Sequence, residues 1–202
     1  MIAENEPLQF QMIHVDDTFA YDVRIISEEA SVGDYIRLLD CFLDEKIAPC
    51  FGCDNCCFQR IPLTLPDLYV YAGKDGARIA DFLREKCEIV YQGRAVDVKL
   101  AQRSDRSCVF LDREKKCCLD HLHRSLVCHS YICIPQTEQA RILRETLINE
   151  GEDALIGDLC RRGLINESFA GSYPPDFAWE GKDFDVILLK EVLPRSVFED
   201  LL

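Results

Sequence analysis

The sequence predicts an α+β fold, a mostly helical single domain with short strands and an irregular, cysteine-rich metal-binding centre. Helical spacing of apolar residues recurs along the 202-residue chain, and segments with strand-like alternation are fewer and shorter. Hydrophobic residues make up 48% of the chain and charged residues 29%, which is ordinary for a globular protein with a core. We expect one domain over 1–202, with the metal-binding centre at about 50–133 and a mainly helical part at 134–202.

The first elements are predicted to be a strand pair and a helix. Residues 8–26 alternate between apolar and polar types, which predicts two strands joined by a tight turn at Asp16–Thr18. Residues 31–47 read as a helix, because Ser31 and Asp34 have the spacing of a capping box. Its apolar stripe is formed by Tyr35, Leu38, Leu39 and Phe42.

Two helices and a strand are expected next. Thr64 suits the N-cap of the first helix, with Asp67 three residues on and Pro66 in the first turn. Residues 77–90 predict a second short helix, and residues 94–102 predict a strand. The stretch 104–120 predicts loops with short strands.

The remainder is predicted to be mainly helical. Residues 136–165 have a helical pattern, which we expect to break into two helices near Gly151. Residues 166–184 form a long loop with two adjacent prolines, and its aromatic residues could either contact a partner or fold back on the core; they are Tyr173, Phe177 and Trp179. A strand over 185–189 and a short helix are expected to close the chain.

The net charge of −13 excludes partners that need a positive surface. We therefore expect neither nucleic acid nor a membrane as partner, which leaves an unknown protein or small molecule. No run of 18 apolar residues occurs, and the first ten residues lack the basic and apolar regions of a secretion signal. We expect a cytoplasmic protein.

Four of the twelve cysteines lie within eight residues, in the pattern C-x2-C-x2-C-C at Cys50, Cys53, Cys56 and Cys57. Disulfides are rare in a reducing compartment, so a dense group of thiols there indicates metal binding or redox chemistry. Two intervening residues let successive thiolates reach the same ion or cluster. The spacing is also that of the start of a bacterial ferredoxin motif, although the usual continuation is missing.

A looser second group follows, with histidines interleaved. It comprises Cys108, Cys117, Cys118, Cys128 and Cys133. Imidazole can bind zinc or iron, but the thiols alone suffice, so we expect His121, His123 and His129 to be loop residues. The isolated cysteines have apolar neighbours on helical patterns and are expected to pack as small hydrophobic residues; they are Cys41, Cys87 and Cys160.

These motifs resemble the family of zinc- or iron-chelating proteins named for its C-x2-C-x2-C-C pattern; flagellin lysine N-methylases carry a similar domain. The family's first motif continues with an Ile, a Thr and an Asp, matched by Ile61, Thr64 and Asp67, and its second motif is matched by Cys108, Phe110 and Leu111. Its third motif is matched by Cys118, Arg124 and Cys128. There, Ser125 replaces a proline, Asp120 and His121 replace an Ile-Tyr pair, and His129 replaces an arginine. The resemblance covers about residues 50–133 and implies metal binding more than any reaction.

The predicted metal ligands are Cys50, Cys53, Cys56, Cys57, Cys108, Cys118, Cys128 and Cys133, with Cys117 as a spare. Side chains of adjacent residues diverge, so Cys56 and Cys57 are expected to serve two different four-thiolate sites. Arg124 lies between two of these ligands and is the predicted cofactor-binding cation, which could offset the charge of a cluster.

Thiolate ligands suit both zinc and iron–sulfur clusters. The ferredoxin-like spacing and the number of cysteines favour an iron–sulfur cluster, most simply 4Fe-4S, with zinc as the alternative. Two functions stay open. One is a redox or enzymatic role for the cluster, and the other is a zinc-stabilised protein-interaction module without catalysis. No glycine-rich loop for a nucleotide or S-adenosylmethionine was found, so whether the chain is an enzyme is left undecided.

Overall fold

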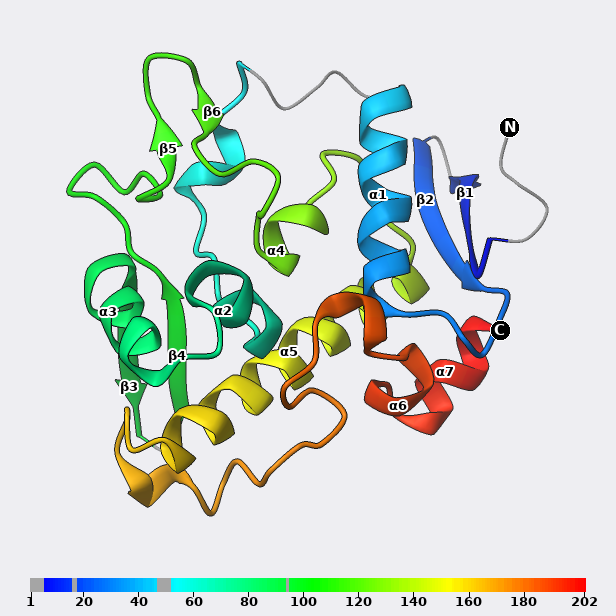
Figure 1. Ribbon diagram of the computed structural model, residues 1–202. Coiled ribbons are helices and arrows are strands. Elements are labelled where there is room, and N and C mark those ends of the chain that lie inside the picture. The colour runs from blue at the N-terminus through cyan, green and yellow to red at the C-terminus, as the bar shows by residue number, and fades with distance from the viewer. Residues whose placement is uncertain (1–5, 16–17, 47–51, 94) are drawn as a thin grey trace. The chain divides into compact units, whose positions relative to one another are not determined.

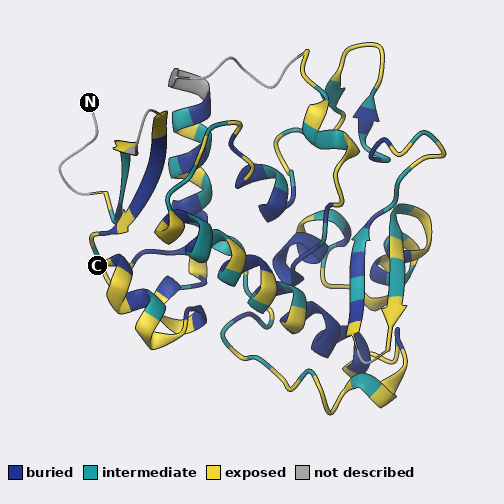
Figure 2. Ribbon diagram, turned by 180° about the vertical axis from the view of Figure 1, so that it is seen from behind, coloured by how far each residue is buried: buried dark blue, intermediate teal, exposed yellow. Residues whose placement is uncertain are grey.

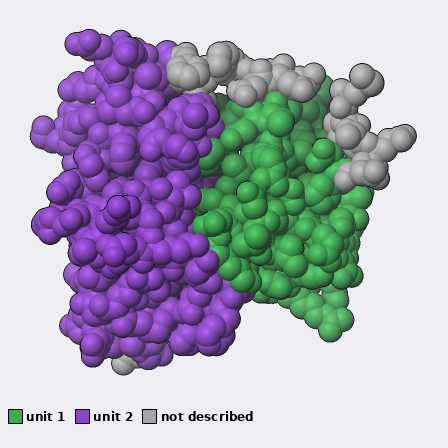
Figure 3. All heavy atoms as spheres, viewed as in Figure 1, with its two compact units in different colours: residues 1–48, 129–147, 182–202 green, residues 49–128, 148–181 purple. Residues whose placement is uncertain are grey.

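The computed structural model describes residues 6–15, 18–46, 52–93 and 95–202, and it has the predicted α+β architecture (Figure 1). The chain forms two compact units (Figure 3). Unit 1 comprises residues 1–48, 129–147 and 182–202, and unit 2 comprises residues 49–128 and 148–181. The assignment of one domain to the whole chain stays a prediction. Within the described ranges, no helix has the length and apolar character needed to cross a membrane.

Unit 1 contains the predicted strand pair. Strands β1 (Leu8–Val15) and β2 (Thr18–Ile25) pair antiparallel, with Leu8 opposite Ile25 and Val15 opposite Thr18. The predicted turn falls largely on residues 16 and 17, which lie outside the described residues. Helix α1 (Val32–Lys46) packs against β1, where the ring of Phe42 stacks on that of Phe10 at 3.8 Å.

The predicted capping box of α1 is present. The Ser31 amide donates to Asp34 Oδ2 over 2.9 Å, and the Asp34 amide donates to Ser31 Oγ over 3.0 Å. Two backbone N–H groups that the helix leaves without intrahelical partners are thereby satisfied. Tyr35 and Leu39 from the predicted stripe are buried in the core.

The last strand predicted in this unit is wrong. Residues 184–186 form a 3₁₀ turn, η3 (Phe184–Val186), which is followed by helices α6 (Leu189–Val192) and α7 (Arg195–Leu201). The apolar run does approach an extended partner, because the Val32 amide donates to the Ile187 carbonyl over 2.9 Å. The neighbouring segment becomes helical at Val32, however, where α1 begins. Only an isolated bridge therefore forms, between Ser31 and Leu188, and no ladder follows.

In unit 2, α2 (Leu65–Ala72) begins at the predicted capping box of Thr64 and Asp67, and it packs against α3 (Gly76–Lys86). Helix α3 is shorter than predicted, because residues 87–92 form strand β3 (Cys87–Gln92). The β-branched pair Ile89–Val90 favours a strand, and β4 (Ala95–Leu100), the strand predicted at 94–102, supplies its antiparallel partner.

The expected break near Gly151 is absent. Helix α5 (Glu138–Arg161) is continuous, with residues 138–147 in unit 1 and residues 148–161 in unit 2. A Cβ atom at Gly151 would lie 2.7 Å from the Cβ of Thr64 and 3.3 Å from the ring of Trp179. Glycine therefore serves close packing of α5 against the start of α2, and it does not end the helix.

The long loop at 166–184 contributes a core residue. Of the two alternatives left open for its aromatic residues, Trp179 takes the second and folds back on the core, where it is fully buried, whereas Phe177 is 78% exposed. Within unit 2, the loop contains a short 3₁₀ turn, η2 (Glu167–Phe169). Figure 2 colours much of α2 and several positions in the second half of α5 as buried, in agreement with Leu65, Leu68 and Leu159 at 0% exposure.

Candidate metal centre

The first cysteine group lies in an irregular segment with one short turn. A 3₁₀ turn, η1 (Asn55–Phe58), carries Cys56 and Cys57, both half-buried. Cys53 precedes it and is exposed. Cys50 lies outside the described residues. The segment has no buried residue of its own within η1, so its position depends on bonds to other segments.

Backbone hydrogen bonds bring the second cysteine group to the first. The Cys108 amide donates to the Cys57 carbonyl over 2.7 Å, and the Gly52 amide donates to the Lys116 carbonyl over 3.0 Å. Lys116 belongs to a hairpin formed by β5 (Leu111–Asp112) and β6 (Cys117–Cys118). The hairpin therefore holds Cys118 on the strand next to the segment that begins with Cys108.

One arginine side chain orders the loop between Cys108 and the hairpin. The Arg103 guanidinium donates to the carbonyls of Cys108 (3.0 Å), Val109 (2.7 Å) and Leu111 (2.9 Å). A rigid group with five N–H donors can satisfy several carbonyls at once, which fixes a loop that has few backbone partners. The hydrogen bonds of Arg103 thus hold Cys108 in place, where a regular strand would use backbone hydrogen bonds.

The last cysteine of this unit is positioned by a buried carboxylate. Asp67 is 1% exposed, and its Oδ2 accepts hydrogen bonds from the amide and hydroxyl of Thr64, each over 2.8 Å. Its Oδ1 accepts from the amide of Leu126 over 2.8 Å. Leu126 starts helix α4 (Leu126–His129), which carries Cys128. One carboxylate therefore caps α2 and also anchors the turn that presents Cys128.

Five cysteines of the described chain converge in unit 2 closely enough for their charges to interact. The pKa of Cys128 is raised to about 12, first by burial and then by the charges of Cys56, Cys108 and Cys118. Burial also raises the pKa values of Cys108 and Cys118, to which neighbouring thiols add. A bound cation would offset the thiolate charge and make the buried thiols of Cys108, Cys118 and Cys128 easier to deprotonate.

The adjacent thiols of Cys56 and Cys57 behave as a pair. They share a hydrogen bond, which lowers the pKa of Cys56 to about 6 and raises that of Cys57. The first proton of the pair is therefore lost easily and the second with difficulty. The two thiols therefore lie close together, and the expectation that they serve different four-thiolate sites stays a prediction.

Arg124 lies where its charge reaches the thiols. The charge of Arg124 contributes to lowering the pKa values of Cys56 and Cys118. Its Nη1 is 2.8 Å from Nε2 of His121, so that histidine faces the arginine. The charge of Arg124 therefore acts on two of the thiols, and its binding to a cofactor stays a prediction.

An aromatic side chain of α2 borders the cluster. The ring of Tyr71 stacks between those of Phe82 and Phe110, with 5.2 Å between centroids on each side. Burial raises the pKa of its hydroxyl, with further contributions from the charges of Asp67, Cys128, Cys118 and Cys108. Tyr71 follows Asp67 by one helical turn, so a single face of α2 carries both residues that border the thiols.

The other candidates are not among these five thiols. Cys133 is exposed and belongs to unit 1. The half-buried Cys117 pairs opposite Asp112 in the hairpin, and its charge reaches Cys118. Two of the histidines contact carboxylates, with His129 Nδ1 2.8 Å from Asp40 and His123 Nδ1 2.7 Å from Asp120.

The isolated cysteines are only partly as expected. Cys160 is 2% exposed in α5, in agreement with a small hydrophobic role. Cys41 is exposed, so its expected packing among apolar neighbours is wrong; on the surface of α1 it faces away from the stripe. Cys87 is half-buried and starts a strand, not a helical turn.

The donor set fits a thiolate-bound metal, although its side chains are not pre-arranged. Among the described residues, no three or more Cys, His, Asp or Glu side chains already stand where they could hold a metal ion. The five interacting thiols nevertheless come from segments that are fixed by hydrogen bonds, and sulfur donors suit zinc and iron–sulfur clusters.

Sequence reasoning missed two supports of the site. Arg103 was missed because nothing in the sequence around it, neither a cysteine spacing nor a charge pattern, distinguishes it from other surface cations. Tyr71 could have been noticed from its i, i+4 relation to Asp67, since the two share a helix face. The contact of Asp67 with Leu126 spans 59 residues and has no local signal.

The comparisons with known proteins agree with this centre. Residues 49–143 match the family described as CxxCxxCC, a putative zinc- or iron-chelating domain. No match was found among curated proteins, and none among solved structures. The matched range includes the cysteine segments, the hairpin and α4 described above, as well as the supporting residues Asp67 and Arg103. Residues 49–143 of the chain are therefore similar to a zinc- or iron-chelating domain, which supports metal binding by this part of the chain.

Proposed function

We propose that the thiols of unit 2 hold a single iron–sulfur cluster, most simply 4Fe-4S, with a redox or enzymatic role in the cytoplasm. The observation that carries this proposal is the convergence of thiols from separate segments, namely Cys56, Cys57, Cys108, Cys118 and Cys128. A structural zinc site and a 4Fe-4S cluster both take four ligands, so the ferredoxin-like C-x2-C-x2-C spacing of Cys50, Cys53 and Cys56 is what favours a cluster. When bound, the cluster would supply one-electron chemistry or an open iron for a substrate.

The chain's own residues have distinct parts in this proposal. Four of the five thiols would be ligands, and the remaining one would lie beside the centre. Arg124 would offset thiolate charge, and Arg103 and Asp67 would position Cys108 and Cys128. Cys50 and Cys53 share the first motif, and Cys133 completes the set proposed from sequence; all three stay candidates.

A zinc-stabilised interaction module is the second candidate. It is favoured by exposed apolar side chains on the loop between two of the thiols, where Leu119 is 65% and Leu122 is 84% exposed. Exposed apolar residues near a rigid, metal-bound loop are suited to contact with another protein. In this case the metal would only hold the loop in place.

Metal analysis of protein purified without oxygen separates the two. The cluster proposal predicts a brown protein containing iron and acid-labile sulfide in equal amounts, with an electron paramagnetic resonance signal that changes on reduction. Colourless protein with stoichiometric zinc, and with no sulfide, would contradict it. One centre also predicts that Cys56→Ser and Cys57→Ser affect the same signal, whereas two centres would give each variant a separate loss.

A further inference from the structure

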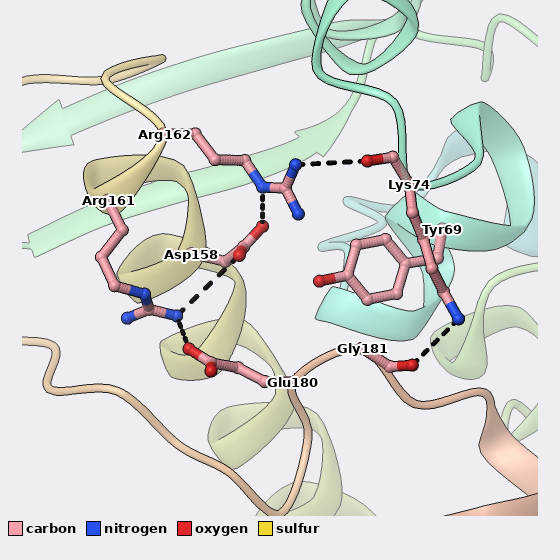
Figure 4. A pocket seen from close by; sticks show the side chains of 7 residues that line it. All are labelled: Tyr69, Lys74, Asp158, Arg161, Arg162, Glu180 and Gly181. Atoms are coloured by element: carbon pink, nitrogen blue, oxygen red, sulfur yellow. Dashed lines mark hydrogen bonds and ion pairs between the residues drawn. The ribbon is translucent and has the colours of Figure 1, made fainter.

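A polar pocket within unit 2 lies outside the cysteine segments. It has a volume of about 350 Å³ and is lined by residues of α2, the α2–α3 turn, the end of α5 and the loop before residue 182 (Figure 4). No residue of the CxxCxxCC motif takes part. We propose that this pocket binds a small anion that carries a carboxylate or phosphate group, independently of the metal centre.

The charges of the pocket do not cancel. Lys74, Arg161 and Arg162 supply three positive charges, and Asp158 and Glu180 supply two negative charges, which leaves one positive charge. The chain as a whole carries −13, so this local excess is opposite in sign to the surrounding protein. An anion with one charge would neutralise the pocket.

A buried carboxylate holds the two arginines in place. The Asp158 side chain is 10% exposed and accepts from Nε of Arg162 over 2.6 Å, while Nη2 of Arg161 lies 3.9 Å away. Arg161 also pairs with Glu180 through the same Nη2 atom. The contacts of Arg161 therefore occupy one end of its guanidinium, and this planar group has five donors in total. Nη1 packs against Gly157, so Nε of Arg161, together with the donors of Arg162 and Lys74, is available to meet a carboxylate or phosphate.

A glycine keeps the space that Arg161 needs. A Cβ atom at Gly157 would lie 3.1 Å from Nη1 of Arg161 and 2.9 Å from the Tyr173 carbonyl oxygen. Glycine inside a helix costs about 1 kcal/mol relative to alanine, so its presence here indicates that close approach of the guanidinium and the 173–174 backbone matters.

The opposite wall adds a cation and a phenol. Lys74 Nζ donates to the Gly181 carbonyl over 2.9 Å and lies 5.5 Å from the centre of the Tyr69 ring. In Figure 4 the Tyr69 hydroxyl points toward the side of the pocket that holds Asp158 and Arg162. A ligand between the walls would therefore meet donors from both sides.

The arginines also have a role without a ligand. Cations near the carboxyl end of a helix interact favourably with its dipole, and Arg161 is the last residue of α5. That stabilising role alone predicts no binding of anions from solution. Two substitutions separate it from anion binding: Arg161→Gln removes a positive charge from the pocket, and Glu180→Gln removes a negative charge.

The test is a calorimetric titration of the full chain, purified with its metal. Inorganic phosphate and malate are the two probes, each titrated separately. We expect saturable one-to-one binding of at least one probe, a loss of affinity of about tenfold in Arg161→Gln, and a gain of several-fold in Glu180→Gln; tenfold corresponds to about 1.4 kcal/mol. Arg195→Gln is the control, because its side chain is 90% exposed in α7 and outside the pocket, and it should bind as the wild type does.

Several outcomes would overturn the proposal. These are no saturable binding of either probe at millimolar concentration, equal losses in Arg161→Gln and Arg195→Gln, or weaker binding in Glu180→Gln. Circular dichroism verifies that each variant folds. If Arg161→Gln does not fold, Glu180→Gln decides alone, and unchanged or weaker binding in it refutes the pocket. Metal content does not enter these criteria, so failure here leaves the proposed cluster untouched.

Discussion

Substitution of Asp67 by asparagine should destabilise unit 2 and release its metal. The buried carboxylate accepts from the Thr64 amide and hydroxyl and from the Leu126 amide, each over 2.8 Å. Asparagine keeps one acceptor oxygen and places an amide N–H₂ group against another donor. Hydrogen bonds to a charged group are worth about 1.5–3 kcal/mol each, and loss of a helix cap costs about 1 kcal/mol, so we expect a loss of about 3 kcal/mol in the free energy of unfolding.

Urea unfolding followed by circular dichroism measures this loss, and competition with a chelator measures the rate of metal release. The control for the chemical change is Asp75→Asn at the exposed N-cap of α3, where Asp75 accepts from Ala77 and Arg78 amides over 3.1 Å. Asparagine caps helices about as well as aspartate, so this variant should change stability by less than about 0.5 kcal/mol.

The control for destabilisation itself is Leu159→Ala, a truncation of a fully buried side chain in α5 that should cost about 2–5 kcal/mol. Because Asp67 anchors the turn that carries Cys128, Asp67→Asn should release metal faster than Leu159→Ala at similar stability. Equal release rates in these two variants, or equal stability of Asp67→Asn and Asp75→Asn, would refute the proposed link between α2 and α4.

Three further predictions concern unit 2. Gly151→Ala should lower the free energy of unfolding in urea by about 1–3 kcal/mol, because the new Cβ would meet Thr64 at 2.7 Å. Gly76→Ala, with open space around it, should be neutral or stabilising, and equal effects of the two substitutions would contradict this packing. Burial raises the pKa of Glu152 to about 7, with Asp97 adding to the effect, so its contribution to stability is present below about pH 4.5 and is lost as the pH rises through 7. Glu152→Gln should therefore flatten the decline in unfolding free energy between pH 5 and 8 by on the order of 2 kcal/mol, and an unchanged slope would count against it. Tyr71→Phe should keep the ring stack and lower the free energy of unfolding by less than about 1.5 kcal/mol, whereas Tyr71→Ala should lower it by about 3–5 kcal/mol. Tyr71→Phe should also alter the visible spectrum of the metal-loaded protein, and an unaltered spectrum would show that the hydroxyl does not interact with the metal centre.

Local signals in the sequence predicted the helix starts well. The capping boxes at Ser31 and Thr64 involve residues only three apart, so spacing alone identifies them. Strands β1, β2 and β4 followed from alternation for the same reason. The family resemblance, read from the cysteine spacing, is confirmed by the match over residues 49–143.

Tertiary contacts explain the errors. Gly151 suggested a break in the helix, but it packs against Thr64, which lies 87 positions earlier in the sequence. The apolar run at 185–189 suggested a strand, but its partner becomes a helix at Val32. The convergence of Cys56, Cys108 and Cys128 likewise depends on Arg103 and Asp67, whose bonds no periodicity reveals.

The central claim is that thiols from separate segments of unit 2 share one metal centre, and cysteine substitution tests it most directly. Metal and sulfide per chain should be measured for Cys128→Ser and for Cys160→Ser, both purified without oxygen. Cys128 interacts with Cys56, Cys108 and Cys118, whereas Cys160 is buried in α5 and lies close to the Asn166 carbonyl. We predict that Cys128→Ser loses most of its metal and that Cys160→Ser keeps the wild-type content. Full metal content in Cys128→Ser would contradict the account.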